Sequence, residues 1–175
     1  MDGWPEGALQ TGMGSSPPFP VPVSRALTLP DLQATARFAG SLARVARKGD
    51  CITLTGDLGA GKTAFARFFI HAASGRHDDV ASPTFNLVLV YAYPAVTIWH
   101  FDLYRLRAPA ESFELGVEDA LAEGIALIEW PDRLGPYLPD DRLDITLDTM
   151  SEHSRAVTLQ AGPSWRDRLS LLDLA

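Results

Sequence analysis

The chain has 175 residues, of which 46% are apolar, and this length and composition suit one globular domain with a sizeable core. Acidic residues outnumber basic ones 22 to 15, and the formal net charge of −7 argues against a broad basic surface for binding tRNA or DNA. Cys51 is the single cysteine, which excludes an internal disulfide framework and a cysteine metal cluster, so we expect it to be a small core residue.

Residues 1–22 contain five of the thirteen prolines and four glycines, and they show almost no hydrophobic periodicity. This composition predicts a disordered tail, followed by a single domain over residues 23–175. The chain lacks a charged start followed by an apolar run, so we expect no secretory signal and a cytoplasmic protein. The most apolar region, residues 85–101, is interrupted by polar residues and is shorter than the ~20 residues that span a bilayer, so we expect no membrane segment.

The first ordered elements are predicted to be a strand and a helix. Residues 25–29 form a short strand candidate, and Pro30 followed by Asp31 is typical of a helix start. Apolar residues then recur at helical spacing until Gly49, which is expected to end the helix. The broad apolar stripe indicates packing against a core and no catalytic role.

The segment from Gly56 to Thr63 carries the strongest functional signal. Its sequence, GDLGAGKT, fits the pattern G-x-x-x-x-G-K-[ST], in which backbone N–H groups surround the phosphates of a nucleotide. In this pattern Lys62 reaches the terminal phosphates and the hydroxyl of Thr63 binds Mg²⁺. Residues 50–55 predict a buried strand before the loop and residues 65–72 a helix after it, so the helix N-terminus should point at the phosphates. These flanking elements argue against an ordinary glycine-rich turn, and the spacing does not fit a dinucleotide fold.

The remaining elements complete an α/β pattern. Residues 125–128 form a continuous apolar run, which is typical of a central strand covered on both faces. We also expect strands at 87–91 and 96–101 joined near Pro94, a short acidic helical stretch at 111–118, strands at 143–147 and 156–159 around the turn 151–154, and a C-terminal helix capped by Ser164. Together these elements predict a three-layer fold like that of P-loop NTPases, with a central, mostly parallel sheet, an antiparallel hairpin and flanking helices.

Two acids are expected near the phosphate loop because each follows an apolar strand. Ligands of an open α/β sheet gather at the carboxyl ends of its strands. Asp102 shares a strand face with His100, and Glu129 directly follows a buried strand. Mg²⁺ keeps several waters, so Thr63 and one acid would be enough to hold it. The residues alone leave open which acid binds the metal and which positions water. Either acid could instead lie at the surface, in an ion pair or as a helix cap.

Three further features are candidates for the site. The segment Ser82-Pro83-Thr84 is a stiff polar turn at a place where nucleotide switches have a segment ordered by the γ-phosphate and Mg²⁺, although a plain turn is the alternative. His100 and His77 are candidate bases, but isolated histidines are more often structural or exposed. Trp130 could cover a nucleotide or simply pack beside the core strand.

Four motifs, taken in their order and spacing, closely resemble the bacterial TsaE family. They are GDLGAGKT at 56–63, SPTF at 82–85, HFDLYRL at 100–106 and IEWP at 128–131. The resemblance extends from about Leu29 to Leu159, and the combination of four ordered motifs makes it specific. Ala64 stands where the family often has a second threonine, but because Thr63 is retained, metal binding is expected to persist.

The resemblance implies a P-loop ATPase that is accessory to the synthesis of threonylcarbamoyladenosine beside the anticodon of certain tRNAs. Proteins of this family bind the complex of TsaB and TsaD, and their ATP hydrolysis, which is weak without these partners, resets that complex between turnovers. They do not carry out the threonylcarbamoyl transfer. The acidic balance of the chain agrees with this role, because the partners would hold the tRNA.

Carried over to this chain, the resemblance implies a role for residues in each motif. Lys62, Asp102 and Glu129 would be catalytic, with Asp102 assisting hydrolysis. Thr63 and Glu129 would hold Mg²⁺, and the switch segment would consist of Ser82, Pro83 and Thr84. ATP would be contacted by Gly59, Ala60, Gly61, Lys62, Thr63 and Ala64, and by the loosely aligned Leu32 and His153.

Two other classes share the phosphate loop. A small-molecule or protein kinase is the main alternative, but no arginine-rich lid segment follows the loop helix. A GTP-driven switch is the second, but the chain lacks the Asn-Lys-x-Asp string that reads guanine.

Overall fold

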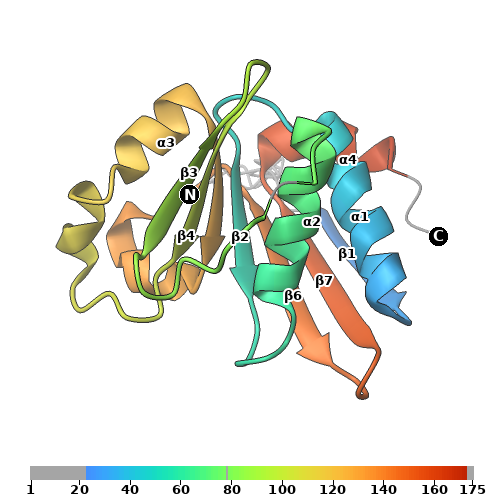
Figure 1. The fold of residues 1–175 in the computed structure, drawn as a ribbon. Coiled ribbons are helices and arrows are strands. Elements are labelled where there is room, and N and C mark those ends of the chain that lie inside the picture. The colour runs from blue at the N-terminus through green and yellow to red at the C-terminus, as the bar shows by residue number, and fades with distance from the viewer. Residues whose placement is uncertain (1–22, 78, 173–175) are drawn as a thin grey trace, which may run out of the picture.

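The computed structural model describes residues 23–77 and 79–172, which fold around a seven-stranded mixed sheet (Figure 1). Its strands are β1 (Val23–Leu29), β2 (Cys51–Thr55), β3 (Val88–Ala92), β4 (Thr97–Asp102), β5 (Ile125–Glu129), β6 (Leu143–Thr149) and β7 (Arg155–Ala161). The α-helices are α1 (Leu32–Val45), α2 (Lys62–Ser74), α3 (Val117–Glu123) and α4 (Arg166–Ser170). Three 3₁₀ segments are η1 (Pro109–Phe113), η2 (Pro131–Tyr137) and η3 (Pro163–Trp165). The predicted tail, residues 1–22, lies outside the described residues.

The strands are arranged in the order β1-β7-β6-β2-β5-β4-β3. The four central strands, β6, β2, β5 and β4, are parallel to one another. The antiparallel pairs lie at the edges, where β3 pairs with β4, β7 with β6, and β1 with β7. The predicted fold class, a mostly parallel sheet with an antiparallel hairpin and flanking helices, is confirmed.

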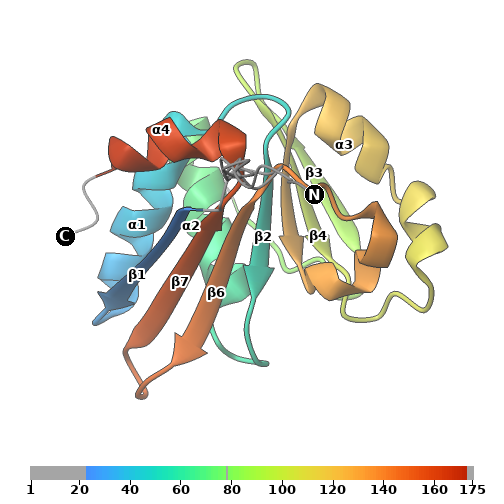
Figure 2. The ribbon, with the colours of Figure 1, turned by 180° about the vertical axis from the view of Figure 1, so that it is seen from behind.

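Helices cover the two faces of the sheet unequally. Helices α1 and α2 lie on one face, and α3 with the neighbouring 3₁₀ segments lies on the other, next to β4 and β5 (Figures 1 and 2). Behind β1, β7 and β6 no helix crosses the sheet in the part of the chain that the structure describes (Figure 2). Exposed residues alternate along β1 for this reason, with Ser24, Ala26 and Thr28 on the open face. The third layer is therefore limited to one half of the sheet.

The continuous apolar run of β5 supplies both cores, as its sequence predicted. All five residues of β5 are buried. Leu127 belongs to the core under α1 and α2, which also contains Phe38 and Phe65. Ile128 faces the opposite way and packs in the smaller core with Phe101. Alternation of side chains along one strand thus fills two layers at once.

The expected helix start at Asp31 is confirmed by its geometry. The carboxylate of Asp31 accepts a hydrogen bond from the backbone N–H of Ala34 at 2.7 Å, which satisfies one of the free donors of the first turn of α1. Helix α2 begins differently, after Gly61 at φ 106°, a conformation that favours glycine.

Three details of the expected helices are wrong. Helix α1 ends at Val45, with Ala46 as its C-cap, and not at Gly49. The acidic stretch at 111–118 is not one helix, because Gly116 adopts a left-handed conformation and separates η1 from α3. Ser164 does not cap α4 but lies inside η3, and its hydroxyl donates to Asp141 at 3.0 Å. The predicted buried face of the C-terminal helix is nevertheless correct, since Trp165 and Leu169 are fully buried. Among residues 23–77 and 79–172, no helix is long and apolar enough to cross a membrane.

A buried ion pair ties α4 to the loop that leads into β2. The guanidinium of Arg168 donates to both carboxylate oxygens of Asp50, at 2.6 and 2.8 Å, and both residues are buried. The same Arg168 donates to the carbonyl of Val45 at the end of α1 and lies over the ring of Trp165. This arrangement satisfies both charges by hydrogen bonds, which a buried pair requires.

Replacing Arg168 with alanine should strongly destabilise the fold. The substitution leaves Asp50 buried without its partner, which costs about 3–5 kcal/mol of unfolding free energy. Urea unfolding followed by circular dichroism measures the loss. Lys48→Ala is the control, because it removes an ion pair whose side chains are largely exposed and should leave the midpoint nearly unchanged. Equal midpoints for the two variants would contradict this assignment.

Cys51 should be chemically inert in the folded protein. It is fully buried in β2, and burial raises the pKa of its thiol to about 12, far above its ordinary value. At about pH 8 only ~1 thiol in 10,000 would be ionised, so a disulfide reagent such as DTNB should react very slowly with the native chain. The same reagent should titrate one thiol after unfolding in guanidinium. Rapid reaction of the native protein would contradict the buried placement.

Candidate functional site

The parallel register brings the two predicted acids together at the carboxyl edge of the sheet. Strand β5 lies between β2 and β4, and Glu129 is in register with Leu54 on one side and Asp102 on the other. Asp102 and Glu129 are therefore neighbours on adjacent strands. Both are almost completely buried. The loop 56–63 leaves β2 at this same edge, as the position of strand ends in an open α/β sheet predicts.

The shape of the loop depends on a close backbone approach at Gly56. Gly56 has φ 147°, and a Cβ atom at this position would collide with the carbonyl oxygen of Leu147 on β6. A side chain is therefore excluded there. The loop then turns into α2, whose first backbone N–H groups face the mouth of the loop, a preferred place for anions.

Lys62 begins α2 and folds back over the loop. Its Nζ donates to the carbonyls of Gly56 and Asp57, at 2.6 and 2.8 Å, and lies 4.3 Å from the ring centroid of Trp130. Burial lowers the pKa of Lys62, while the nearby carboxylates of Glu129 and Asp102 act in the opposite direction. The ammonium group is thus partly desolvated and held above the loop, where it can meet an anionic ligand.

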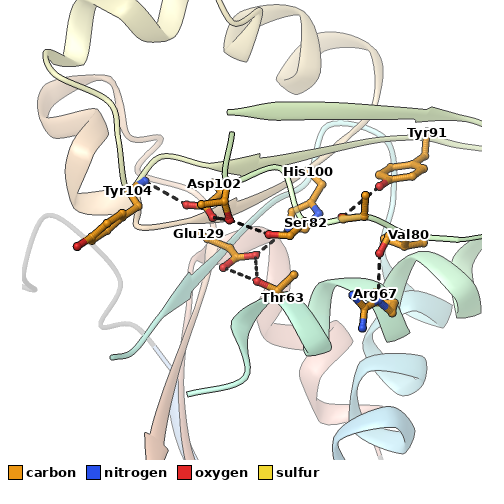
Figure 3. Close-up of polar contacts among 11 residues, drawn as sticks. Thr63, Arg67, Val80, Ser82, Tyr91, His100, Asp102, Tyr104 and Glu129 are labelled. Carbon is orange, nitrogen blue, oxygen red and sulfur yellow. Dashed lines mark hydrogen bonds and ion pairs between the residues drawn. The ribbon is translucent and has the colours of Figure 1, made fainter. Parts of the chain in front are cut away.

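Thr63 and Glu129 join the helix to the strand end (Figure 3). The hydroxyl of Thr63 donates to Oε1 and Oε2 of Glu129, at 2.8 and 3.1 Å. His100 lies behind the carboxylate, with Nε2 at 2.9 Å from Oε1. The predicted metal residues, Thr63 and Glu129, are therefore in direct contact.

The predicted switch segment reaches the second acid. Thr84 donates from its hydroxyl to Oδ2 of Asp102 at 2.7 Å, and the hydroxyl of Ser82 lies 2.7 Å from that of Thr84 (Figure 3). The other carboxylate oxygen, Oδ1, accepts from the backbone N–H of Tyr104 at 3.1 Å. Pro83 is buried, and its carbonyl accepts from the N–H of Leu87 at 2.6 Å. Residues 82–84 are thus coupled to Asp102 by a chain of hydroxyl groups.

Two pockets border the loop and share Gly61 and Ala64 in their linings. The first, of about 210 Å³, is lined by Lys62, Thr63, Asp102 and Glu129 together with Leu58, Gly59, Gly61, Ala64, Thr84, Tyr104 and Trp130. The second, of about 550 Å³, brings together Leu32 and His153, which are far apart in sequence, with Ala60, Gly61 and Ala64 of the loop region. The two loosely aligned residues therefore face the same hollow beside the loop.

The donor set of the first pocket fits magnesium. One hydroxyl and one carboxylate, from Thr63 and Glu129, meet at the helix N-terminus. Within residues 23–77 and 79–172 no cluster of three or more His, Cys, Asp or Glu side chains forms a metal cage. Mg²⁺ uses few protein oxygens and completes its shell with water and phosphate, so a two-residue set is suitable.

The sequence reasoning missed two contributors to the site, Tyr104 and Arg155, and left the role of Trp130 open. Tyr104 packs its ring 4.9 Å from that of Trp130. Trp130 takes a left-handed conformation at φ 58°, which is uncommon for a bulky residue and turns its ring over Lys62. Arg155 donates to the carbonyl of Ala60 at 2.8 Å and to carbonyls of the 151–154 turn. No local pattern distinguishes Arg155 from a surface arginine.

The two candidate histidines differ in placement. His100 lies in the site and is fully buried, so the expectation of a structural histidine describes it better than a solvent-linked base. His77 lies beyond the C-terminal end of α2, beside the ring of His71 at 5.4 Å, and does not reach the site.

The fold and the site together define the class of the protein. A parallel strand leads into a glycine-rich loop, a lysine and a threonine open the following helix, and two acids close the neighbouring strand ends. This combination is that of the P-loop NTPases.

Comparison with known proteins defines the family within this class. The family model described as "Threonylcarbamoyl adenosine biosynthesis protein TsaE" matches residues 29–157. The chain is 38% identical over 133 residues to the tRNA threonylcarbamoyladenosine biosynthesis protein TsaE of Rickettsia felis, covering 76% of this chain and 78% of the relative. It is 35% identical over 130 residues to the protein of the same name from Bacillus subtilis, covering 74% and 80%. The crystal structure of Bacillus subtilis YdiB matches with a TM-score of 0.68 and 26% identity over 86% of this chain and 94% of that one. The chain belongs to the TsaE family, as its four motifs indicated.

Removing the side chain of Arg155 should loosen the loop and the 151–154 turn together. Its three hydrogen bonds to backbone carbonyls join these segments, and each contributes ~0.5–1.5 kcal/mol. In Arg155→Ala, amide hydrogen exchange should therefore accelerate by about tenfold or more at the 151–154 turn and at residues 60–61. Arg133→Ala, which alters a partly exposed side chain elsewhere, serves as the control. Unchanged exchange in Arg155→Ala would show that the two segments are held independently.

Proposed function

We propose that this protein is a Mg²⁺-dependent ATPase that supports the formation of threonylcarbamoyladenosine in tRNA. The observation that carries the proposal is the meeting of Lys62 and Thr63, at the start of α2, with Asp102 and Glu129 at two neighbouring strand ends. Phosphoryl transfer needs positioning, a metal and charge neutralisation more than covalent help, and these four side chains can supply them. The family membership supports the tRNA part of the proposal.

ATP would bind along the loop from one pocket to the other. The backbone N–H groups of residues 59–64 surround the phosphates in this arrangement, and the N-terminus of α2 adds its favourable field for negative charge. The nucleoside would occupy the larger pocket, which is lined by Leu32 and His153 and borders Gly61 and Ala64 of the loop region.

The residues at the smaller pocket have separable roles in hydrolysis. Thr63 and Glu129 would hold Mg²⁺, which when bound would neutralise negative charge on the phosphates. Lys62 leaves its carbonyl partners for the terminal phosphates. Asp102, fixed by Thr84 and the N–H of Tyr104, accepts a hydrogen bond from the attacking water and orients it. Water displaces ADP from the γ-phosphorus, and the products are ADP and inorganic phosphate.

The Thr84–Asp102 hydrogen bond supports a switch role for Ser82, Pro83 and Thr84. Loss of the γ-phosphate would change the charge next to Asp102. Because Asp102 is the hydrogen-bond acceptor of the Thr84 hydroxyl, that change would alter the contact that holds Thr84. Thr84 lines the pocket and Ser82 is exposed, so a partner can sense the conformation of this segment.

We further propose that the partners are TsaD and TsaB and that hydrolysis resets their complex between turnovers. The chain would not catalyse the threonylcarbamoyl transfer, and tRNA would be contacted only through the partners. The net charge of −7 is consistent with such an indirect role. ATPase activity without the partners is expected to be weak, and we propose a cytoplasmic location.

Lys62→Ala should weaken Mg²⁺-ATP binding by about 10- to 150-fold, because a charge-assisted contact to phosphate is worth ~1.5–3 kcal/mol. Isothermal titration calorimetry with a non-hydrolysable ATP analogue measures the change. Lys48→Ala, an exposed lysine at a distance from the loop, is the matched control. Equal affinity for GTP in the wild-type protein would argue for a different nucleotide.

Glu129→Gln should abolish most partner-stimulated hydrolysis while retaining partner binding. The amide keeps the size of the side chain but removes the negative charge expected to hold the metal. The experiment measures phosphate release with and without TsaB and TsaD, together with co-elution of the three proteins. A wild-type rate indifferent to both partners would contradict the proposed role, and transfer of the γ-phosphate to a metabolite would identify a kinase instead.

A further inference from the structure

His100 is a buried polar side chain whose position is not explained by packing alone. It lies on β4, next to the edge strand β3, and is fully buried, in register with Leu127 of β5. Strand alternation directs it to the same face as Asp102 and away from Phe101, which packs in the core on the other side. A histidine at an otherwise apolar position must find hydrogen-bond partners to offset its desolvation.

The two ring nitrogens of His100 have different surroundings. Nε2 lies 2.9 Å from Oε1 of Glu129. Nδ1 is buried and has no hydrogen-bond partner among the described residues. Because Oε1 belongs to a carboxylate, which only accepts, the contact requires a hydrogen on Nε2.

The two oxygens of Glu129 are consequently not equivalent. Oε1 accepts from both His100 and Thr63, at 2.9 and 2.8 Å. Among the described residues, Oε2 accepts from Thr63 alone, at the longer distance of 3.1 Å. A carboxylate held at one oxygen from behind the strand has a fixed orientation about its last rotatable bond. The other oxygen, with a single longer hydrogen bond, keeps acceptor capacity for a ligand.

We propose that His100 is a positioning residue that donates from Nε2–H to Oε1 of Glu129 and thereby presents Oε2 to the metal. This inference rests on the proposed function, because it takes Glu129 as a magnesium ligand. The ring is fully buried and contacts Glu129, so it acts on the reaction through Glu129 and not as a base. Hydrogen bonds behind a metal ligand commonly set its orientation, and removing them typically costs ~10- to 100-fold in metal affinity.

A matched pair of substitutions isolates the Nε2–H group. Glutamine can place an amide N–H near the position of Nε2, whereas methionine has a similar length and no such donor. His100→Met should raise the Mg²⁺ concentration needed to strengthen ADP binding by about 10- to 100-fold, and His100→Gln should restore most of the wild-type value. Calorimetric titration of ADP at several Mg²⁺ concentrations measures this directly, independently of hydrolysis. Urea unfolding of both variants separates the effect from a loss of stability.

The imidazole itself provides a second measurement that needs neither nucleotide nor metal. Long-range ¹H–¹⁵N NMR spectra of the wild-type protein distinguish a ring with its hydrogen on Nε2 from one with a bare Nε2. We expect a protonated Nε2 whose signal shifts in Glu129→Gln. This test remains decisive if His100→Met fails to fold.

The possible outcomes separate this inference from the proposed function. A bare Nε2, or equal Mg²⁺ dependence in the Met and Gln variants, overturns the positioning role and leaves the ATPase proposal intact. An ADP affinity that does not respond to Mg²⁺ in the wild-type protein contradicts the metal assignment, and with it both the ATPase mechanism and the presentation of Oε2. A protonated Nε2 together with a defect in His100→Met that His100→Gln relieves supports the inference.

Discussion

The hydrogen bond between Thr63 and Glu129 is the contact on which the arrangement of the site depends. It joins the first turn of α2 to the last residue of β5 and so fixes the loop 56–63 against the sheet edge. Because β5 lies between β2 and β4, any shift of Glu129 would also move its register partner Asp102. The backbone carbonyl of Glu129 reinforces the arrangement by accepting from the N–H of Leu103 at 3.1 Å. Helix, loop and both acids are therefore positioned as one unit.

The order of the strands explains why motifs so distant in sequence form one site. The phosphate loop, the switch segment and the two acids are contributed from the ends of β2, β4 and β5 and from the connection between α2 and β3. Parallel strands bring their carboxyl ends to the same edge of the sheet, whatever the length of chain between them. The antiparallel strands are confined to the sheet edges, where they leave this geometry undisturbed.

The sequence predicted those parts of the structure that depend on local or periodic signals. The loop motif, the alternation that pairs His100 with Asp102, and the apolar run of β5 each follow from residue type and spacing. The role of Arg155 could not be predicted, because its hydrogen bond to Ala60 joins residues 95 positions apart. Ser164 was wrongly predicted to cap the C-terminal helix. A serine before a helix often caps it, but here the hydroxyl donates to Asp141 in a loop distant in sequence. Tertiary contacts of this kind have no sequence period.

The two ends of the sheet differ in how their buried polar and charged groups are satisfied. At the carboxyl edge the structure holds a left-handed Trp130, a desolvated Lys62 and two nearly buried acids, each of which is unfavourable without a ligand or partner. At the opposite end, where β2 begins, the Asp50–Arg168 pair satisfies both of its charges and binds α4 to the end of α1. Strand β2 connects the two ends directly, since Asp50 precedes its first residue and the loop follows its last. The strained edge is thus carried on a strand that is anchored firmly at its other end, which keeps the ligand-binding groups in place without requiring them to contribute to folding.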